Sequence, residues 1–140
     1  LQDLYVPIIS VARNPYGIEL AWPWVKKNWD ELAQRLGKTK TLLSRIIESL
    51  GVLSDFESQK EIKKFFEKNP TPGTERALAQ TLERIGINAK LLEAVKVRLE
   101  KERADLEVEL RELQKARLEE LNVEKGKFKQ WKIDLERSLQ

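Results

Sequence analysis

The last third of the chain constrains its fold more than any other part. Residues 92–140 contain no proline, and Gly126 is their only glycine. Between residues 96 and 140, 12 Lys or Arg alternate with 11 Asp or Glu. Proline and glycine are the residues that most oppose a helix interior, so their scarcity predicts one long helix. A helix from Thr74 to Glu124 would be about 75 Å long at ~1.5 Å per residue.

Large apolar residues recur every seven positions along this segment. One series runs from Leu92 to Leu113 and a second from Leu121 to Leu135, and the two do not join in phase. Such an offset is a stutter in a heptad pattern. The pattern predicts a coiled coil, made either by a dimer or by a hairpin with a break at Gly126, and leaves parallel and antiparallel pairing open. The predicted interface residues are Leu99, Leu106, Leu110, Leu113, Leu118, Leu121, Phe128, Trp131, Leu135 and Leu139.

Three tryptophans fall within residues 21–32, AWPWVKKNWDEL. Two of them belong to a series of apolar residues at steps of three and four, which is one continuous face of an α-helix. We therefore interpret them as core and not as a base-stacking platform. Trp24 lies off this face, and Pro23 predicts a helix that starts near Ile18 or kinks. The face consists of Ile18, Trp22, Val25, Trp29, Leu32 and Leu36.

Turn residues divide the first ninety residues into further helices. An opening helix, with Leu1, Leu4, Tyr5, Ile8 and Ile9 at helical spacing, should end at residues 13–17, where Gly17 can take a positive φ. Gly37 and Gly51 close later helices, Ser54 or Asp55 caps another, and residues 69–73 break the chain again. The predicted bundle core is Trp22, Val25, Trp29, Leu32, Ile46, Leu50, Phe65, Phe66, Leu78, Leu82 and Ile85.

The composition argues against several kinds of function. The chain has no Cys and no His, so it lacks a thiolate nucleophile and the commonest general base and zinc ligand. We expect no enzyme activity, no metal and no cofactor. A net charge of +3 from mixed signs does not resemble a nucleic-acid footprint. The absence of Met and of a secretory signal pattern suggests a piece of a larger, cytoplasmic protein.

One group of residues offers an alternative role in binding. Residues 124–132, EKGKFKQWK, interleave lysines with Phe128 and Trp131, a pattern that can bind single strands or an anionic membrane. A coiled-coil seam is the favoured interpretation, so nucleic acid and membrane are disfavoured as partners.

Two stretches, NPYGIELAWPWVKKNWDEL and KKFFEKNPTPGTERALAQTLERIGIN, resemble the C-terminal helical domain of zinc aminopeptidases of the aminopeptidase N class. That group includes the tricorn-interacting factors and the antigen-trimming enzymes of the endoplasmic reticulum. The resemblance covers about residues 1–93, and Pro23 and Gly86 depart from it. Matching residues of the first motif are Asn14, Pro15, Gly17, Leu20, Ala21, Trp22, Asn28 and Trp29. Those of the second motif are Phe65, Phe66, Pro70, Gly73, Arg84, Ile85, Ile87 and Asn88.

This resemblance implies a HEAT-like stack of antiparallel helices that caps a peptidase chamber. By the same resemblance, four arginines could face that chamber and bind a peptide carboxylate: Arg13, Arg45, Arg76 and Arg84. The family's zinc motif, His-Glu-x-x-His, lies in another domain, so no catalytic residue carries over. Gly86 would permit a close contact or a bend.

We therefore expect an all-α fold: an antiparallel helical bundle at residues 1–93 that continues into a coiled-coil helix at residues 94–140. The abrupt change of pattern near Glu93 favours an engineered chimera, made recombinantly, in which a non-catalytic scaffold displays a coiled coil. The expected partner is a second copy or another helix. The main alternative is a natural fragment of an aminopeptidase cap domain.

Overall fold

A computed structural model describes residue 3 and residues 5–140. All the secondary structure in this part of the chain is helical, so the all-α prediction is confirmed. The chain divides into two compact units, Leu1–Val95 and Lys96–Gln140. No helix in the described part is long and apolar enough to cross a membrane.

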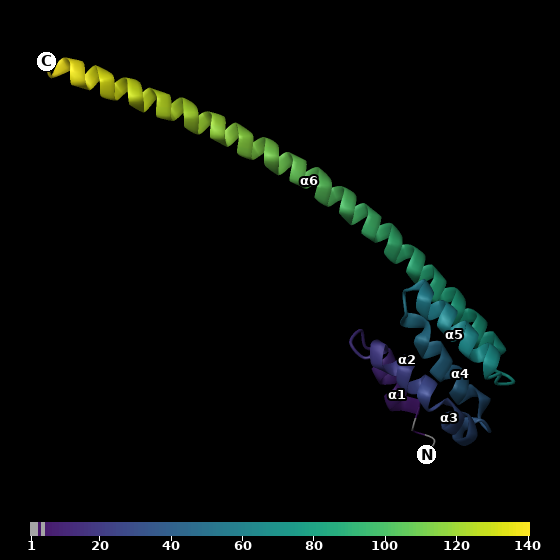
Figure 1. The fold of residues 1–140 in the computed structure, drawn as a ribbon. Coiled ribbons are helices and arrows are strands. Elements are labelled where there is room, and N and C mark those ends of the chain that lie inside the picture. The colour runs from purple at the N-terminus through teal and green to yellow at the C-terminus, as the bar shows by residue number, and fades with distance from the viewer. Residues whose placement is uncertain (1–2, 4) are drawn as a thin grey trace. The chain divides into compact units, whose positions relative to one another are not determined.

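The first unit contains five helices, a short 3₁₀ turn and the first turns of a sixth helix (Figure 1). Helix α1 contacts α2 and α4, and α3 also packs on α4. Leu1 and Leu4, which we expected in the opening helix, lie outside the described residues. The elements are α1 (Tyr5–Ala12), α2 (Ile18–Lys27), α3 (Trp29–Leu36), α4 (Lys40–Ser49), η2 (Leu50–Val52), α5 (Phe56–Lys68) and α6 (Glu75–Ser138).

The predicted helix through residues 18–36 is in fact two helices. Asn28, with φ −107° and ψ 14°, separates α2 from α3. Its side-chain amide donates to the Trp24 carbonyl at 2.8 Å, which competes with a regular helix. The Leu32 amide still donates to the Asn28 carbonyl at 3.0 Å. The break is therefore only one residue long, and Trp22 and Trp29 both remain in the core.

Helix α2 begins at Ile18 and includes Pro23 in its interior. The first of the two predicted solutions, a start near Ile18, is the observed one. Of the two predicted caps of the helix after Gly51, Asp55 is the observed one. Its carboxylate accepts from the Ser58 amide at 2.6 Å at the start of α5.

The prediction of a positive φ at Gly17 is wrong. Gly17 has φ −92°, and among the described residues only Gly73, at φ 93°, has a positive value. A Cβ on Gly17 would lie 2.2 Å from the Val11 carbonyl oxygen. Glycine is needed there because α1 approaches the turn so closely.

One hydrophobic core joins all six α-helices of the first unit. Of the predicted core residues, the structure places eight in the buried cluster: Trp22, Val25, Trp29, Leu32, Ile46, Leu50, Phe66 and Ile85. Phe65, Leu78 and Leu82 are partly buried against it. The cluster also contains Ile8, Leu36, Leu43, Ile47 and Ile62.

Helix α6 is unbroken from Glu75 to Ser138. It passes Gly126 without a bend that would fold it back on itself, so the hairpin alternative finds no support. At Gly86 the helix also continues, and the glycine allows a close contact: a Cβ there would lie 2.7 Å from the Gln59 amide nitrogen.

Candidate functional site

Four aromatic side chains form the centre of the bundle. Trp29 and Phe66 meet edge to face with ring centroids 4.9 Å apart, and Trp22 meets Phe65 in the same way at 5.4 Å. Both indoles are almost fully buried, at 4% and 3% exposure. Two of the three clustered tryptophans thus serve the core, and edge-to-face pairs of this kind add to the stability from burial.

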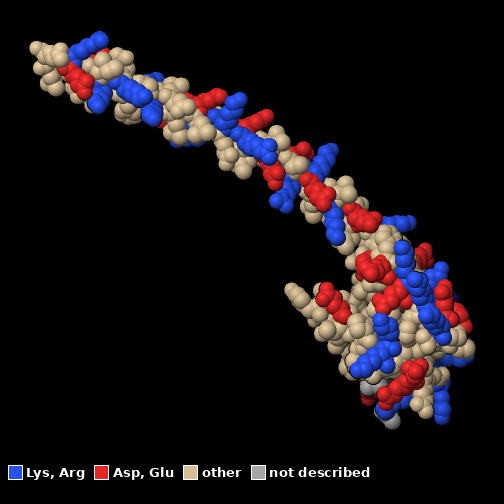
Figure 2. Space-filling model, in the orientation of Figure 1, with Lys and Arg blue, Asp and Glu red and all other residues tan. Residues whose placement is uncertain are grey.

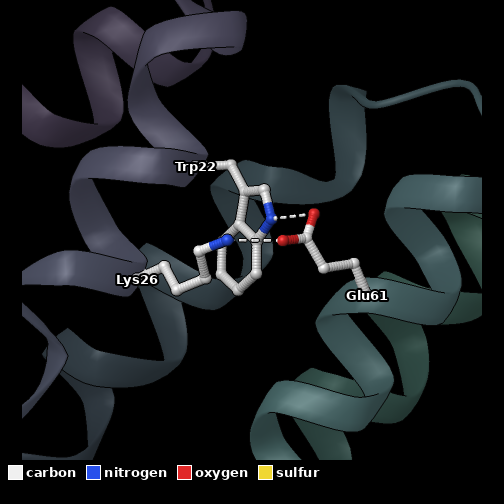
Figure 3. Close-up of polar contacts among 3 residues, drawn as sticks. All are labelled: Trp22, Lys26 and Glu61. Atoms are coloured by element: carbon white, nitrogen blue, oxygen red, sulfur yellow. Dashed lines mark hydrogen bonds and ion pairs between the residues drawn. The ribbon is translucent and has the colours of Figure 1, made fainter.

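A single carboxylate connects α2 to α5 at the edge of this aromatic cluster (Figure 3). Glu61 accepts from the Trp22 indole nitrogen at 3.0 Å and from Lys26 Nζ at 2.5 Å. The hydrogen bonds from Lys26 and then Trp22 lower the pKa of Glu61. Glu61 therefore stays ionised as the partner of a buried indole N–H, which would otherwise be costly to leave unpaired.

Polar side chains also fasten the beginning of α6 to the bundle. The Asn88 amide donates to the carbonyls of Gly51 and Leu53 at 3.0 and 3.1 Å. The Gln59 amide donates to the Leu82 carbonyl at 2.7 Å. Asn88 is one of the residues of the second motif, and its contacts give that motif position a structural role.

An apolar groove runs between α1 and α2. It has a volume of about 310 Å³, and its exposed walls include Val11, Leu20 and Trp24. Leu20 is 70% exposed and Trp24 45%. An exposed apolar patch on a small helical unit is typical of a surface that contacts other protein. The full lining is Pro7, Ile8, Val11, Leu20, Ala21 and Trp24.

The four arginines considered for peptide binding do not form one site. Arg13 and Arg84 line a polar cleft of about 290 Å³ with Glu48, whose carboxylate offsets part of their charge. Arg45 lies elsewhere, over the Tyr5 ring at 5.8 Å. Arg76 is exposed.

The second unit is a single helix whose described side chains are all exposed. Figure 2 shows acidic and basic side chains alternating with uncharged ones along this part of α6. Ion pairs between neighbouring turns, such as Arg98–Glu102 at 2.9 Å, support the helix itself. The large apolar residues remain open to solvent, with Leu106 63%, Leu113 64% and Phe128 70% exposed.

The predicted interface residues do not all share one face of this helix. At ~100° per residue, Leu118 lies about 100° around the helix from Leu99. The other predicted residues lie within about 40° of Leu99. They are Leu106, Leu110, Leu113, Leu121, Phe128, Trp131, Leu135 and Leu139.

Sequence patterns did not reveal Glu61, Asn88 or the α1–α2 groove as features of interest. Glu61 and Asn88 depend on contacts between residues far apart in the chain; Trp22 and Glu61, for example, are 39 positions apart. The groove depends on how two consecutive helices, α1 and α2, lie against each other. The only available signal for Asn88 was its place in the second motif. For the groove, it was the position of Trp24 off the helical face.

No feature of the described residues suggests a metal centre, since no group of three or more potential ligands comes together there. The recognisable surfaces are instead two apolar ones, the α1–α2 groove and the exposed face of α6. Both are suited to contact with protein.

Comparison with known proteins agrees with the fold and the motifs. Residues 1–87 match the family model described as the ERAP1-like C-terminal domain. Aminopeptidase 2, mitochondrial, of Saccharomyces cerevisiae is 41% identical over 91 residues, which are 64% of this chain and 10% of that protein. Endoplasmic reticulum aminopeptidase 2 of Bos taurus is 38% identical over 96 residues, 66% of this chain and 10% of that protein.

The chain thus spans about a tenth of the length of these relatives. The matches support a natural piece of an aminopeptidase domain and give no support to the engineered fusion expected from the sequence pattern. Only the C-terminal, non-catalytic domain is matched. By its match over residues 1–87, the chain belongs to the ERAP1-like C-terminal domain family of the aminopeptidases.

Proposed function

We propose that the first unit is a structural, non-catalytic segment of an aminopeptidase C-terminal domain, and that its α1–α2 groove packs against another part of such a domain. The groove carries this proposal, because its walls are almost entirely apolar and include the half-exposed Trp24. Burying such a surface against a neighbouring helix is favourable. The chain itself has no His for the family's zinc motif.

The experiment is complementation of a truncated relative. Aminopeptidase 2 of Saccharomyces cerevisiae would be produced without the 91-residue region that matches this chain. Binding of the full present chain would be measured by calorimetry, and recovery of the relative's peptidase activity in parallel. We expect binding, and we expect the present chain alone to hydrolyse no aminopeptidase substrate, with or without added zinc.

A matched pair of variants tests the groove. Trp24→Asp with Leu20→Ser should weaken the binding, whereas Tyr16→Ser should not, although Tyr16 is an aromatic residue with 89% exposure. Equal binding by both variants would refute the groove as the contact. Metal-dependent hydrolysis by the chain alone would refute the non-catalytic assignment.

We further propose that the second unit binds a helical partner through its exposed apolar face. The observation behind this is a helix of 64 residues whose distal apolar side chains are all exposed. A long helix of this kind normally owes its stability to packing on another surface. A second copy of the chain would be such a partner.

Light scattering on the full chain tests this second proposal. Leu106→Glu with Leu113→Glu should lower the mass from dimer to monomer. The control is Val97→Glu with Val108→Glu, which adds the same charges about 160–180° away from Leu99. Val97 and Val108 are similarly exposed, at 66% and 53%, and their replacement should leave the dimer intact.

The alternative function for the basic and aromatic residues at 125–132 is binding to an anionic polymer. A salt-dependent association with single-stranded nucleic acid, lost when Lys127, Lys129 and Lys132 become Glu, would favour that role. The flanking acidic residues, Glu124 and Asp134 among them, oppose it.

A further inference from the structure

The apolar face of the second unit, which contains Leu99 and the predicted interface residues within about 40° of it, has an internal symmetry. Because α6 is uninterrupted through this unit, residues at ~100° per step can be placed around one helix. Of the predicted interface residues from Leu99 to Leu135, all but Leu118 stay within a sector of about 80°. The four-residue stutter after Leu113 keeps them there and does not divide them into two faces.

This face reads almost the same in both directions from Arg117. Leu99 and Leu135 are each eighteen residues from Arg117, Leu106 and Phe128 each eleven, and Leu113 and Leu121 each four. We infer that the second unit pairs antiparallel with the same unit of a second copy of this chain, about a two-fold axis at Arg117. The inference rests on the pairing proposed above and adds its orientation and register.

In this arrangement three pairs of apolar residues face each other, whereas Leu110 lies opposite Glu124 of the second copy and Trp131 opposite its Arg103. Leu99 lies opposite Leu135 of the second copy, Leu106 opposite its Phe128, and Leu113 opposite its Leu121. Because the two-fold axis repeats each pair, these three pairs form six layers of contact.

Charges beside the seam favour the antiparallel orientation. In this register, a residue beside the apolar face contacts a residue on the same side of that face in the second copy. Glu100 then lies beside Lys132 of the second copy, Glu107 beside its Lys125, and Glu109 beside its Lys127. Each of these contacts joins opposite charges, and such flanking pairs set the orientation of coiled coils. One contact, Glu102 with Asp134, joins like charges.

In a parallel pair in register, more of the flanking contacts would join like charges than opposite charges. Flanking residues would then meet residues five positions along the partner. Glu102 would lie beside Glu107 of the second copy, and Lys127 beside its Lys132, whereas Glu120 beside its Lys125 would join opposite charges. On a larger scale, residues 100–112 carry six acidic and three basic groups, a net charge of −3, and residues 125–132 carry four lysines and no acid. Only the antiparallel arrangement places these two segments side by side.

Three polar residues lie on this face, Arg103, Arg117 and Glu124, and the first two fit this register. Arg103 lies opposite Trp131 of the second copy, so a guanidinium can cover an indole in a cation–π contact. Arg117 lies opposite itself at the centre. Its guanidinium already bonds to Glu120 of its own helix at 3.1 Å, which reduces the repulsion between the two copies. A polar residue at one seam position is a known means of fixing register.

Cysteine cross-linking tests the orientation directly, because the chain has no native Cys. Three single variants of the full chain are needed: Arg117→Cys, Leu106→Cys and Phe128→Cys. In the antiparallel pair, positions 106 and 106 of the two copies are about 33 Å apart, whereas a disulfide requires Cα atoms within ~7 Å. Position 106 lies beside position 128 of the other copy, and 117 beside 117.

On mild oxidation, Arg117→Cys should form a disulfide dimer by itself. Leu106→Cys and Phe128→Cys should each remain largely uncross-linked alone, and an equimolar mixture should give the mixed disulfide, identified by its mass. Light scattering under reducing conditions would report whether each variant associates.

The outcomes separate the two proposals. Cross-linking of Leu106→Cys with itself would show a parallel pair and overturn the inference. Association without the mixed disulfide would show another register and overturn the inference while leaving the pairing intact. A monomeric chain at all concentrations would refute the pairing, and the orientation with it.

Discussion

The indole nitrogen of Trp22, on α2, donates a 3.0 Å hydrogen bond to the carboxylate of Glu61, on α5. Lys26 binds the other oxygen of the same carboxylate at 2.5 Å. One exposed acid therefore completes the hydrogen bonding of a tryptophan that is 4% exposed and links two helices of the bundle. This contact joins the aromatic core to the surface charge of the domain.

Replacing Glu61 should destabilise the bundle. Hydrogen bonds to charged groups contribute ~1.5–3 kcal/mol, but the Glu61 side chain is 45% exposed, so solvent screening reduces this to about 1 kcal/mol for Glu61→Ala. Urea unfolding followed by tryptophan fluorescence measures the change. Glu67→Ala, an exposed acid on the same helix, is the control and should change stability by less than ~0.5 kcal/mol. Equal effects of the two variants would show that the Glu61 contacts add nothing.

The same contact makes part of the stability depend on pH. The pKa of Glu61 is lowered in the fold by its bonds to Lys26 and Trp22. Its contribution is therefore complete above the ordinary value of 4.5 and is lost as the pH falls through the lower value of the folded state. The stability difference between the native chain and Glu61→Ala should shrink as the pH falls below 4.5. Urea unfolding at about pH 7 and about pH 3 measures it.

Glu75 acts in the same direction, because bonds from the backbone N–H groups of Glu75 and Gly73 lower its pKa. It is present in both proteins, so its effect cancels in the difference. A difference that stayed constant across this range would contradict the role of the ionised Glu61.

Helical spacing was sufficient to predict most of the buried residues of the first unit. The series containing Trp22 and Trp29 survives the break at Asn28 because that break is one residue long and the Leu32 amide still reaches the Asn28 carbonyl. The break itself was not predictable, because it depends on a local bond from the Asn28 side chain. Residue spacing shows periodicity, but it does not show that a side chain bonds to a backbone carbonyl of the helix.

The role of Gly17 shows a second limit of sequence reasoning. Its position in a turn suggested a backbone need, yet the observed reason is the nearby Val11 carbonyl. The contacts of Glu61 and the α1–α2 groove also could not be predicted, because both arise from the packing of different helices. In the second unit, by contrast, the symmetry about Arg117 is present in the sequence, and it became interpretable once α6 was known to be continuous.

Two glycines should respond to alanine with opposite signs. Gly73 has φ 93°, and a Cβ there would lie 2.5 Å from Lys40 Cδ, so Gly73→Ala should cost about 1–2 kcal/mol. Gly126 has no atom within 4 Å of such a Cβ, so Gly126→Ala should favour the helix by up to ~1 kcal/mol. Thermal unfolding followed by circular dichroism measures both. Destabilisation by Gly126→Ala would indicate that the helix bends there in solution.

The first turns of α6 should be needed for the bundle. Ile85 is fully buried, whereas Ile87, two residues on, is 59% exposed. Ile85→Ala removes core atoms and should cost ~2–5 kcal/mol. Ile87→Ala, the matched control on the same helix, should cost less than ~1 kcal/mol. The measurement is urea unfolding of the full chain followed by tryptophan fluorescence, and similar losses from the two variants would mean that α6 does not pack as described.

Charge reversal should test the flanking contacts of the antiparallel pair independently of cross-linking. Glu109→Lys places lysine beside Lys127 of the second copy, and Lys127→Glu places glutamate beside its Glu109. The two-fold axis makes each change act twice, and exposed pairs are worth ~0.2–1 kcal/mol, so either variant should weaken self-association about tenfold. The double variant restores opposite charges and should return the dissociation constant to near that of the native chain, as measured by sedimentation.

The control for this cycle is Glu109→Lys combined with Lys129→Glu. Lys129 lies about 120° from Leu99 around the helix, on the flank opposite to that of Glu109, so this change keeps the net charge and should not restore binding. Recovery by both double variants would mean that net charge alone governs association. Recovery by the Glu109→Lys, Lys127→Glu double variant alone is the result expected if these residues face each other across the seam.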